Sequence, residues 1–397
     1  MARPPGLAGL RWTGLPLGPG APVRVASASR PRPGGGVRVT TLGADRTVAG
    51  ARRRARAEAI ERLAGFFRRT EPRVRATRRE LGEAAIDPAE VLLYSRRQLA
   101  RGIDRGRVVR AFDPARSMDW TALWSLTNSV RRFLPTRLIY YGCPAHPGSA
   151  FGRADSNGVA AGRTVADATV RALLELIERD AVALWWYRRA PRPALGTAVW
   201  RGSLADRIRR WFESQGRACW ALDLTSDLGV PVVAAVSAIG DGDIRLGFGA
   251  GFDRKAALER AMLEMAQLTA IAGAADRRSV RLPPDLGRWL REVDTAGEPQ
   301  LVPARAGATA SRCRPGGTAV ARLSRLVSLL ARSGLEVLAV ELSRPEFALK
   351  VVRVVVPGLR PWWRRLAPGR LYSAPVAAGW LDSEGNEPAV NPRSLPF

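Results

Sequence analysis

A short acidic phrase occurs three times in this chain, and its residue types could bind a metal ion and phosphate. The copies read R-A-R-A-E-A-I-E-R (54–62), R-A-L-L-E-L-I-E-R (171–179) and R-A-M-L-E-M-A-Q (260–267). Residues three positions apart share one face of an α-helix, so each phrase presents a pair of side chains together. The paired residues are Glu58 with Glu61, Glu175 with Glu178, and Glu264 with Gln267.

The surroundings of the phrase favour a binding site over a solvated face. A single Glu pair beside Arg is common on an exposed helix, where it forms salt bridges. Here the residue order recurs, and the neighbours of the second and third copies are apolar nearly all round, which is typical of a buried helix. Buried carboxylates require a cation. The apolar neighbours are Leu173, Leu174, Leu176, Ile177, Met262, Leu263 and Met265.

Mg²⁺ is the cation that this pattern favours. It prefers oxygen ligands and binds through a few carboxylates together with phosphate oxygens. An Arg beside each Glu pair could contact the same phosphates. The phosphate-binding loop G-x-x-x-x-G-K-[ST] does not occur in the sequence, which excludes a P-loop mechanism. The residues therefore predict a magnesium-nucleotide site of another kind, carried by three helices.

Periodicity and turn residues predict the elements that position these side chains. Helices are expected at 48–69, 164–188 and 253–274, each carrying one phrase. Residues 1–36 are expected to be irregular with some extended segments, and residues 296–317 to form a flexible linker. Strands and helices mix without a strict βαβ rhythm, which predicts a mixed α/β (α+β) fold with antiparallel strands backed by long helices. Further helices are expected at 202–215 and 318–333, and strands at 37–41, 120–127, 138–141, 218–224, 231–238, 244–249, 336–342 and 350–357.

Composition bounds the class of protein. The chain has 397 residues, of which 46% are hydrophobic, enough for one large domain or two to three ordinary ones. No run of about 18 apolar residues is present, and the N-terminus lacks the apolar region of a signal peptide. Three scattered cysteines form no CxxC pair and predict no disulfide framework, so a reduced, cytoplasmic protein is expected.

The net charge of +27 raises the question of a nucleic-acid partner. Of the 63 basic residues, 61 are Arg, and they are spread along the chain rather than gathered in one stripe. With abundant Ala, Gly and Pro, this composition is typical of GC-rich codon usage, and it favours an acidic peptide partner over a nucleic acid. His146 is the only histidine and lies in a Pro- and Gly-containing loop, which argues against a His-rich zinc site and most Ser-His-Asp schemes.

Several motifs in order resemble the YcaO family. The most specific is D-S-N-G-V-A-A-G-R-T (155–164) followed by A-L-L-E-L-I-E-R-D-A (172–181). The resemblance covers residues 35–397, after a Pro/Gly-rich segment at 1–34. The other matching stretches are A-E-A-I-E-R (57–62), W-S-L-T (124–127), G-F-G-A-G (247–251), L-E-M-A-Q (263–267), V-V-R-V-V-V-P-G-L-R-P (351–361), G-R-L-Y-S-A-P-V (369–376) and N-P-R-S-L-P-F (391–397).

The resemblance implies site residues for ATP and Mg²⁺. The glutamates of the three phrases would bind the metal, and the Pro-containing tail (391–397) would lie near the reacting peptide, with Pro396 and Phe397 as candidate catalytic residues. Ser156 and Asn157 belong to the SNG loop, which read alone could equally be a plain Asx turn. The implied metal ligands are Glu58, Glu61, Glu175, Glu178 and Glu264, and the implied nucleotide-binding residues are Arg62, Ser156, Asn157, Asp167, Arg179 and Gln267.

The resemblance also implies an activity and partners. In the azole-forming branch, a Cys, Ser or Thr of a ribosomally made precursor peptide attacks the preceding carbonyl, and ATP phosphorylates the resulting oxygen. A separate leader-binding protein resembling ThiF-type enzymes, a flavin dehydrogenase and a homodimer are the partners it suggests. Three departures from the family pattern stand at Ala44 (usually Lys), Arg163 (commonly Asn) and Thr269 (often Arg). Two alternatives stay open: a thioamide-forming enzyme that uses external sulfide, and a non-catalytic peptide-binding scaffold.

Overall fold

The computed structural model of the chain describes residues 7, 9–31, 38–104, 107–144, 149–305 and 310–396. Expectations for His146 and Phe397, and the expected boundary between residues 34 and 35, lie outside these residues. The fold is of the mixed α/β class that the sequence predicts, with antiparallel sheets and long helices.

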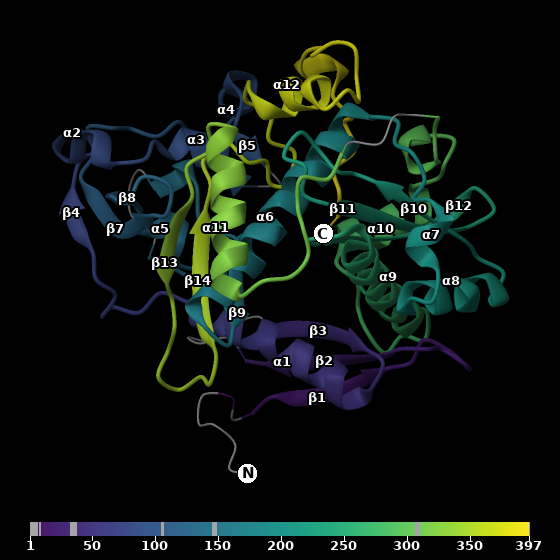
Figure 1. Ribbon diagram of the computed structural model, residues 1–397. Coiled ribbons are helices and arrows are strands. Elements are labelled where there is room, and N and C mark those ends of the chain that lie inside the picture. The colour runs from purple at the N-terminus through teal and green to yellow at the C-terminus, as the bar shows by residue number, and fades with distance from the viewer. Residues whose placement is uncertain are drawn as a thin grey trace.

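Three main antiparallel sheets build the molecule (Figure 1). One consists of β1 (Arg11–Leu15), β2 (Arg24–Arg30) and β3 (Val39–Asp45). A second consists of β10 (Ala218–Asp223), β11 (Val232–Ile239) and β12 (Gly242–Ala250). The third has the order β4-β7-β13-β14-β9, with β8 beside β7. Its strands are β4 (Val74–Ala76), β7 (Met118–Ser125), β8 (Arg131–Pro135), β9 (Val159–Gly162), β13 (Leu338–Glu341) and β14 (Lys350–Val355).

Each of the three acidic phrases lies on a long helix that follows a strand. These helices are α1 (Val48–Ala64) after β3, α6 (Val165–Arg188) after β9, and α9 (Arg254–Asp276) after β12. Their N-caps are Thr47, Thr164 and Asp253, whose side chains accept a hydrogen bond from a backbone N–H in the first turn. The three helices expected at 48–69, 164–188 and 253–274 are therefore present, although the first ends at Ala64.

Glycines let two of these strands lie unusually close to their helices. A Cβ atom on Gly43 of β3 would lie 2.2 Å from the carbonyl oxygen of Ala51 in α1. A Cβ atom on Gly249 of β12 would lie 2.2 Å from the carbonyl oxygen of Ala257 in α9. No side chain fits at such a distance, so both strands need glycine at this point. The two units β1–β2–β3–α1 and β10–β11–β12–α9 are thus built in the same way.

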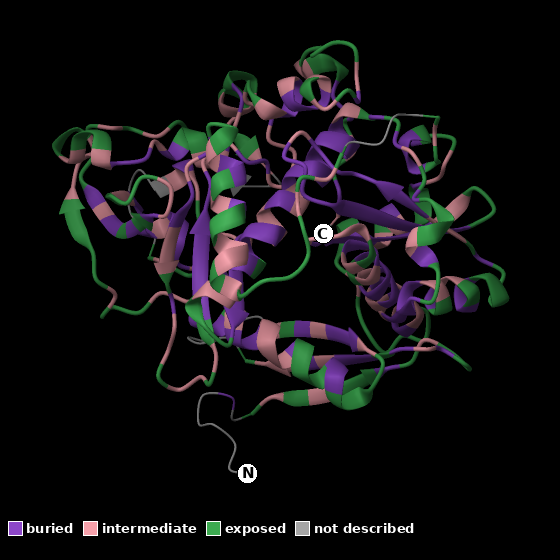
Figure 2. Cartoon of the chain, in the orientation of Figure 1, coloured by how far each residue is buried: buried purple, intermediate pink, exposed green. Residues whose placement is uncertain are grey.

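Helix α6 runs through the middle of the molecule, and most of it is buried (Figure 2). Its apolar side chains join one core with β11, β12, β14 and α11 (Ala319–Arg332). A second core lies on the other face of the β10–β12 sheet, between that sheet, α8 (Leu204–Ser214) and α9. A helix that is apolar nearly all round is expected in such a position.

Shorter elements complete the chain. They are α2 (Arg78–Leu81), η2 (Gly82–Ala84), α3 (Pro88–Leu92), α4 (Arg96–Arg101), β5 (Ile103–Asp104), β6 (Arg107–Val108), α5 (Thr136–Ile139), η3 (Ser149–Phe151), α7 (Thr197–Trp200), α10 (Pro284–Glu292), η4 (Pro299–Leu301), α12 (Arg370–Ala377) and η5 (Glu387–Ala389). In the described part of the chain no helix has the length and apolar character needed to cross a membrane. The three cysteines are free thiols.

Three expectations about local structure are wrong, at least in part. The strand expected at 138–141 is wrong, because Tyr140 N donates to Thr136 O at 3.1 Å and closes the helical turn α5. Its Ile and Tyr content reflected burial rather than strand conformation. The helix expected at 48–69 is wrong at its C-terminal end, because α1 stops at Ala64 and Gly65 is its C-cap. The extended segments expected within residues 1–36 are present as β1 and β2, which pair with each other, and β2 pairs with β3.

The third correction concerns the linker expected at 296–317. Its first part is ordered and packed, since Glu298, Gln300 and Leu301 are at most 3% exposed. Residues 306–309 lie outside the described part of the chain. Gly and Pro content predicted a loop correctly here, but it could not reveal that the loop packs into the core.

Candidate nucleotide and metal site

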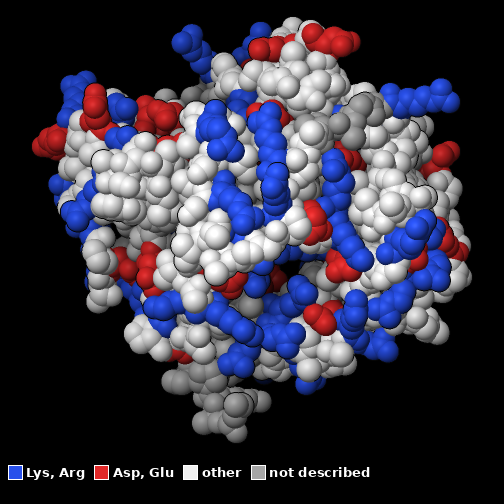
Figure 3. Space-filling model, viewed as in Figure 1, with Lys and Arg blue, Asp and Glu red and all other residues white. Residues whose placement is uncertain are grey.

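Helices α1, α6 and α9 bring five glutamates into one electrostatically connected group. The carboxylates of Glu58 and Glu175 both act on Glu61, and Glu264 acts on Glu178. Figure 3 shows a hollow at the centre of this face, where Figure 1 places α1 below, α9 to one side and β9 with α6 to the other. Acidic side chains lie at its edge and basic side chains surround it. The three copies of the phrase therefore converge, as the sequence predicts.

In the first and third phrases, the first glutamate accepts a hydrogen bond from the strand of its own unit. Leu42 N in β3 donates to Glu58 Oε2 at 3.0 Å. Phe248 N in β12 donates to Glu264 Oε2 at 2.5 Å. Each bond fixes one oxygen of its carboxylate, and the other oxygen of Glu58 pairs with Arg62.

The second glutamate of a phrase reaches the strand of the next unit. Ala161 N in β9 donates to Glu61 Oε1 at 2.9 Å, and Ala250 N in β12 hydrogen-bonds to Glu178. The third helix, α9, packs against β3 and closes the cycle, with Gln267 in the place of the second glutamate. The three strand–helix units are thus arranged in a ring. Glu61 links the α1 unit to β9, and Glu178 links the α6 unit to β12.

Four of these carboxyl groups, those of Glu61, Glu175, Glu178 and Glu264, have raised pKa values. Burial, together with the nearby carboxylates of Glu58 and Glu175, raises the pKa of Glu61 to about 8, against the opposing effects of Ala161 N–H and Arg171. Burial likewise raises the pKa of Glu175 and of Glu178 to about 7. The Glu175 side chain is 24% exposed. The hollow is therefore open to solvent, although protein surrounds the carboxyl group on most sides. Burial also raises the pKa of Glu264.

Two arginines of the phrases pair with glutamates on their own helices. Arg62 Nη2 lies 2.6 Å from Glu58 Oε1, and Arg179 Nη2 lies 3.2 Å from Glu175 Oε1. The guanidinium of Arg179 also lies over the ring of Trp362, 3.1 Å from its centroid. Arg179 Nε and Nη1 are buried and have no hydrogen-bond partner among the described residues. Buried unpaired donors of a charged group are costly, so these atoms suit an anionic ligand.

The arginine that begins each phrase also belongs to the site, although the sequence analysis assigned it no role. Arg54, Arg171 and Arg260 are exposed, and the charge of Arg171 acts on the Glu61 carboxyl group. Arg260 interacts with the charges of Glu178, Arg171 and Arg54. The repetition of this residue in all three copies was the signal that could have identified it.

Asp155 and Arg353 form a charged pair that the sequence analysis also did not identify. Arg353 is 2% exposed, donates to the backbone oxygen of Asp155, and has its Nη2 4.0 Å from the Asp155 carboxylate. Burial raises the pKa of Asp155, while Arg353 and Arg179 act in the opposite direction. An arginine inside the otherwise apolar strand V-V-R-V-V-V was the available signal, because a buried charge needs a partner.

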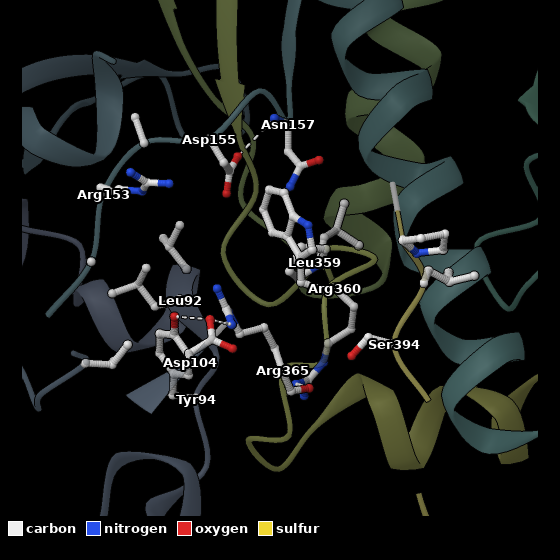
Figure 4. Close-up of a pocket in the computed structure, with 18 of the residues that line it drawn as sticks. Leu92, Tyr94, Asp104, Arg153, Asp155, Asn157, Leu359, Arg360, Arg365 and Ser394 are labelled. Atoms are coloured by element: carbon white, nitrogen blue, oxygen red, sulfur yellow. Dashed lines mark hydrogen bonds and ion pairs between the residues drawn. The ribbon is translucent and has the colours of Figure 1, made fainter. Parts of the chain in front are cut away.

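The SNG loop and the end of the chain border a separate cavity of about 1510 Å³. Its walls include Asn157, Leu176 of α6 and Pro396. None of the five glutamates lines it, but Leu176 lies on α6 between Glu175 and Glu178. Figure 4 shows Asp155 and Asn157 at one side of this cavity, with Ser394 lying across from Tyr94 and Asp104. The cavity therefore adjoins the carboxylate site.

The remaining candidate residues differ in their local contacts. Asp167 accepts from Arg163 N at 3.2 Å and pairs with Arg171 Nε at 3.2 Å, so it completes the first turn of α6. Ser156 is exposed and borders a smaller basic pocket together with Arg62. Asn157 N donates to Asp155 Oδ1 at 2.9 Å, which is the Asx turn that its sequence allowed. Gln267 is half-buried on the inner face of α9.

The donor groups fit Mg²⁺ and phosphate, although the carboxylates are not gathered around one point. Among the described residues, no three His, Cys, Asp or Glu side chains are close enough together to hold a metal ion. Carboxylates without a cation repel one another and pair with Arg62, Arg179 or backbone N–H groups. Carboxylate oxygens are the ligands that Mg²⁺ prefers, and the unpaired nitrogens of Arg179 suit phosphate.

Comparison with known sequences supports a nucleotide site. The model of the YcaO cyclodehydratase family, described as ATP- and Mg²⁺-binding, matches residues 42–360. An uncharacterized protein from the tfuA 3′ region of Rhizobium leguminosarum bv. trifolii is 30% identical over 310 residues, covering 70% of each chain.

Comparison with solved structures gives the same result. A heterocyclase in complex with substrate and cofactor is similar over 98% of this chain, with a TM-score of 0.88 and 33% identity. The heterocyclase TruD is similar over 87% of this chain, with a TM-score of 0.77 and 37% identity. The matches cover 54% and 51% of those two proteins, so this chain spans about half of their length.

Proposed function

The chain belongs to the YcaO family, whose domain binds ATP and Mg²⁺, and from this premise we propose that it is an ATP-dependent peptide cyclodehydratase. Its substrate would be a ribosomally made precursor peptide in which Cys, Ser or Thr becomes an azoline ring. The observation that carries the proposal is the ring of three strand–helix units, with five glutamates and the unpaired nitrogens of Arg179 in its centre.

The proposed reaction removes one water from the peptide at the expense of one ATP. The thiol or hydroxyl gives up its proton as it attacks the carbonyl carbon of the preceding residue, and the amide oxygen takes up a phosphoryl group from ATP, which leaves as ADP. The phosphorylated oxygen then departs as phosphate, the amide nitrogen loses its proton, and a C=N bond completes the ring. Phosphorylation converts a poor leaving group into a good one.

Named residues would divide this work. Mg²⁺, held by Glu61, Glu175, Glu178 and Glu264 with Glu58 beside them, would neutralise the phosphate charge. Arg179, fixed over Trp362, would donate to a phosphate oxygen. The exposed arginines at the edge of the hollow would attract the anionic nucleotide. Pro396 borders the neighbouring cavity, where the reacting part of the peptide would lie.

The proposed partners follow from the family resemblance and the charge. A separate leader-binding protein of the ThiF-like kind would deliver the precursor, and a flavin dehydrogenase could oxidise the ring to an azole. Because the net charge is +27, an acidic leader or an acidic partner surface would associate readily. A homodimer and a cytoplasmic location complete this proposal.

Mass spectrometry of the precursor tests the proposal. The purified chain, its partner and Mg·ATP should remove one water per modified residue and release one phosphate per ring. The Glu175→Gln, Glu178→Gln double variant should do neither. Absence of both water loss and ATP hydrolysis in the wild-type protein with its partner would overturn the proposed activity.

A second candidate function is thioamide formation. The rhizobial relative comes from the tfuA region, which keeps open a role in a sulfur-linked pathway. The same site would activate the amide oxygen, and external sulfide would then replace the side-chain nucleophile. The same experiment with added sulfide distinguishes the two, because thioamide formation exchanges oxygen for sulfur and loses no ring water. A non-catalytic scaffold would bind the precursor without hydrolysing ATP.

A further inference from the structure

The end of the described chain (residues 391–396) forms one wall of the large cavity beside the carboxylate site. Figure 4 shows the chain around Ser394 passing along this wall next to α6. Asn391 N donates to Tyr187 O at 2.8 Å, and Trp186 Nε1 donates to Arg393 O at 2.8 Å. Asn391 and Leu395 are each 1% exposed. The segment is therefore anchored to the fold at Asn391, Arg393 and Leu395, while Pro392 and Ser394 between them are exposed.

The buried carboxylate of Glu298 also holds segment 391–396 in place. Its side chain is 4% exposed. Glu298 Oε2 accepts from Asn391 Nδ2 at 2.7 Å, and Glu298 Oε1 accepts from Arg393 Nε at 3.1 Å. Charge-assisted hydrogen bonds of this kind are among the stronger ones in proteins. Glu298 thus contacts both the first and the third residue of the segment.

The backbone around Glu298 is itself fixed by two tryptophans. Trp185 Nε1 of α6 donates to Gln300 O at 3.1 Å, and Trp220 Nε1 of β10 donates to Leu301 O at 2.8 Å. Gln300 Nε2 also donates to Glu298 Oε2 at 2.8 Å. The stretch that Gly and Pro content predicted to be a linker is therefore a rigid support, and it connects the segment to α6, the helix that carries Glu175 and Glu178.

We propose that Glu298 is a positioning residue that holds segment 391–396 as a wall of the cavity and so sets the rate of ring formation. The inference rests on the proposed function, because it assigns the reacting peptide to this cavity. Glu298 lies far along the chain from the phrases and contacts none of their glutamates in the described structure. Its loss should therefore impair the placement of the peptide and leave the binding of Mg·ATP intact.

Hydrogen exchange gives a readout that does not depend on activity. In Glu298→Gln, which keeps the side-chain volume but replaces one acceptor oxygen with a donor, the amides of Arg393, Ser394 and Leu395 should exchange at least about tenfold faster. Amides in the core of α9 should exchange as in the wild type. Glu292→Gln is the matched control, since Glu292 is half-exposed and lies 3.6 Å from the same Arg393. It should leave the exchange of 393–395 unchanged.

Kinetics then separates a positioning role from a general loss of structure. Glu298→Gln should lower kcat for ring formation about tenfold while KM for Mg·ATP stays within about twofold. Asn391→Leu breaks the same contact from the other side, so the effects of the two variants should be clearly less than additive in the double variant. If Glu298→Ala does not fold, Glu298→Gln and Asn391→Leu still supply both measurements.

Two results would overturn this inference. One is unchanged exchange of residues 393–395 in both Glu298→Gln and Asn391→Leu. The other is faster exchange accompanied by an equal loss of Mg·ATP affinity, which would indicate general destabilisation. Failure of the wild-type protein to form azolines would instead contradict the proposed function, and the exchange data would still show whether Glu298 holds the segment.

Discussion

The units β1–β2–β3–α1 and β10–β11–β12–α9 have the same construction but offer different groups to the central hollow. Both contain a three-stranded antiparallel sheet, a glycine pressed against the helix, and a glutamate that accepts from the strand. One helical turn after this glutamate, α1 carries Glu61 and α9 carries Gln267. Helix α1 follows with the exposed Arg62, where α9 has the buried Leu268.

The difference shows how a repeated unit can be divided between support and chemistry. Helix α9 packs under β10–β12 and α8, and its apolar side chains belong to the core. Helix α1 buries mainly small residues, such as Ala51, Ala55 and Ala59, and exposes its arginines. Charge is therefore concentrated on α1 and α6, while α9 contributes one carboxylate and much of the packing. Variants that make the units more alike test this division.

The largest effect is expected when α1 is made to resemble α9. Glu61→Gln keeps the size of the side chain and its ability to accept from Ala161 N but removes the negative charge. Because this variant removes a proposed Mg²⁺ ligand, Mg·ATP should bind at least about 100-fold more weakly. Isothermal titration calorimetry measures this loss. Binding within about threefold of wild type would show that Glu61 is not a ligand.

The raised pKa values predict how the free energy of unfolding changes with pH. Glu61 titrates at about 8 and Glu175 and Glu178 at about 7, against an ordinary value of 4.5, so the folded chain holds protons that the unfolded chain releases. Without metal, the free energy of unfolding should therefore be greatest at low pH in this window. It should fall as pH rises from about 5 to about 8.

Denaturant unfolding at several pH values, in chelator, measures this dependence. Binding of Mg·ATP requires the ionised carboxylates, so affinity should rise over the same range and binding should release protons. In Glu61→Gln the part of the dependence near pH 8 should disappear. Stability that rises with pH between about 5 and 8 would contradict the account.

A smaller effect is expected when α9 is made to resemble α1. Gln267→Glu adds a carboxylate near a group that already contains Glu178 and Glu264. In chelator the variant should be less stable by about 1–2 kcal/mol, because like charges repel and burial disfavours the ionised form. Added Mg²⁺ should restore most of the loss, as thermal unfolding with and without the metal would reveal. Gln267→Met, which adds no charge, is the control and should respond little to Mg²⁺.

The smallest effect is expected at Asp167, which lies outside the glutamate group. It accepts from Arg163 N and pairs with Arg171, and both it and its partner are partly exposed. Asp167→Asn should lower stability by only about 0.5 kcal/mol and change Mg·ATP affinity less than about threefold. Calorimetry decides this, since a tenfold or greater loss of affinity would make Asp167 a ligand, as the family resemblance implies.

The local features of the site could be predicted from the sequence, and its long-range features could not. Repetition of R-A-x-x-E with apolar neighbours predicts α6 and α9 closely and identifies the glutamates. The hydrogen bond from Ala161 to Glu61 joins residues a hundred positions apart, and no local pattern contains it. The role of Glu298 was hidden for the same reason, because Gly and Pro around it indicate a loop but not what the loop contacts. L-I-Y-Y was misassigned since apolar content reports burial more reliably than conformation.

The central claim is that α1, α6 and α9 hold one Mg·ATP between them. Anomalous diffraction from crystals grown with Mn²⁺ and a non-hydrolysable ATP analogue tests it most directly, because Mn²⁺ substitutes for Mg²⁺ and can be located without ambiguity. The account predicts Mn²⁺ bound by carboxylates from at least two of the three helices, with Arg179 on a phosphate oxygen. Mn²⁺ and phosphates located away from Glu61, Glu175 and Glu178 would contradict it.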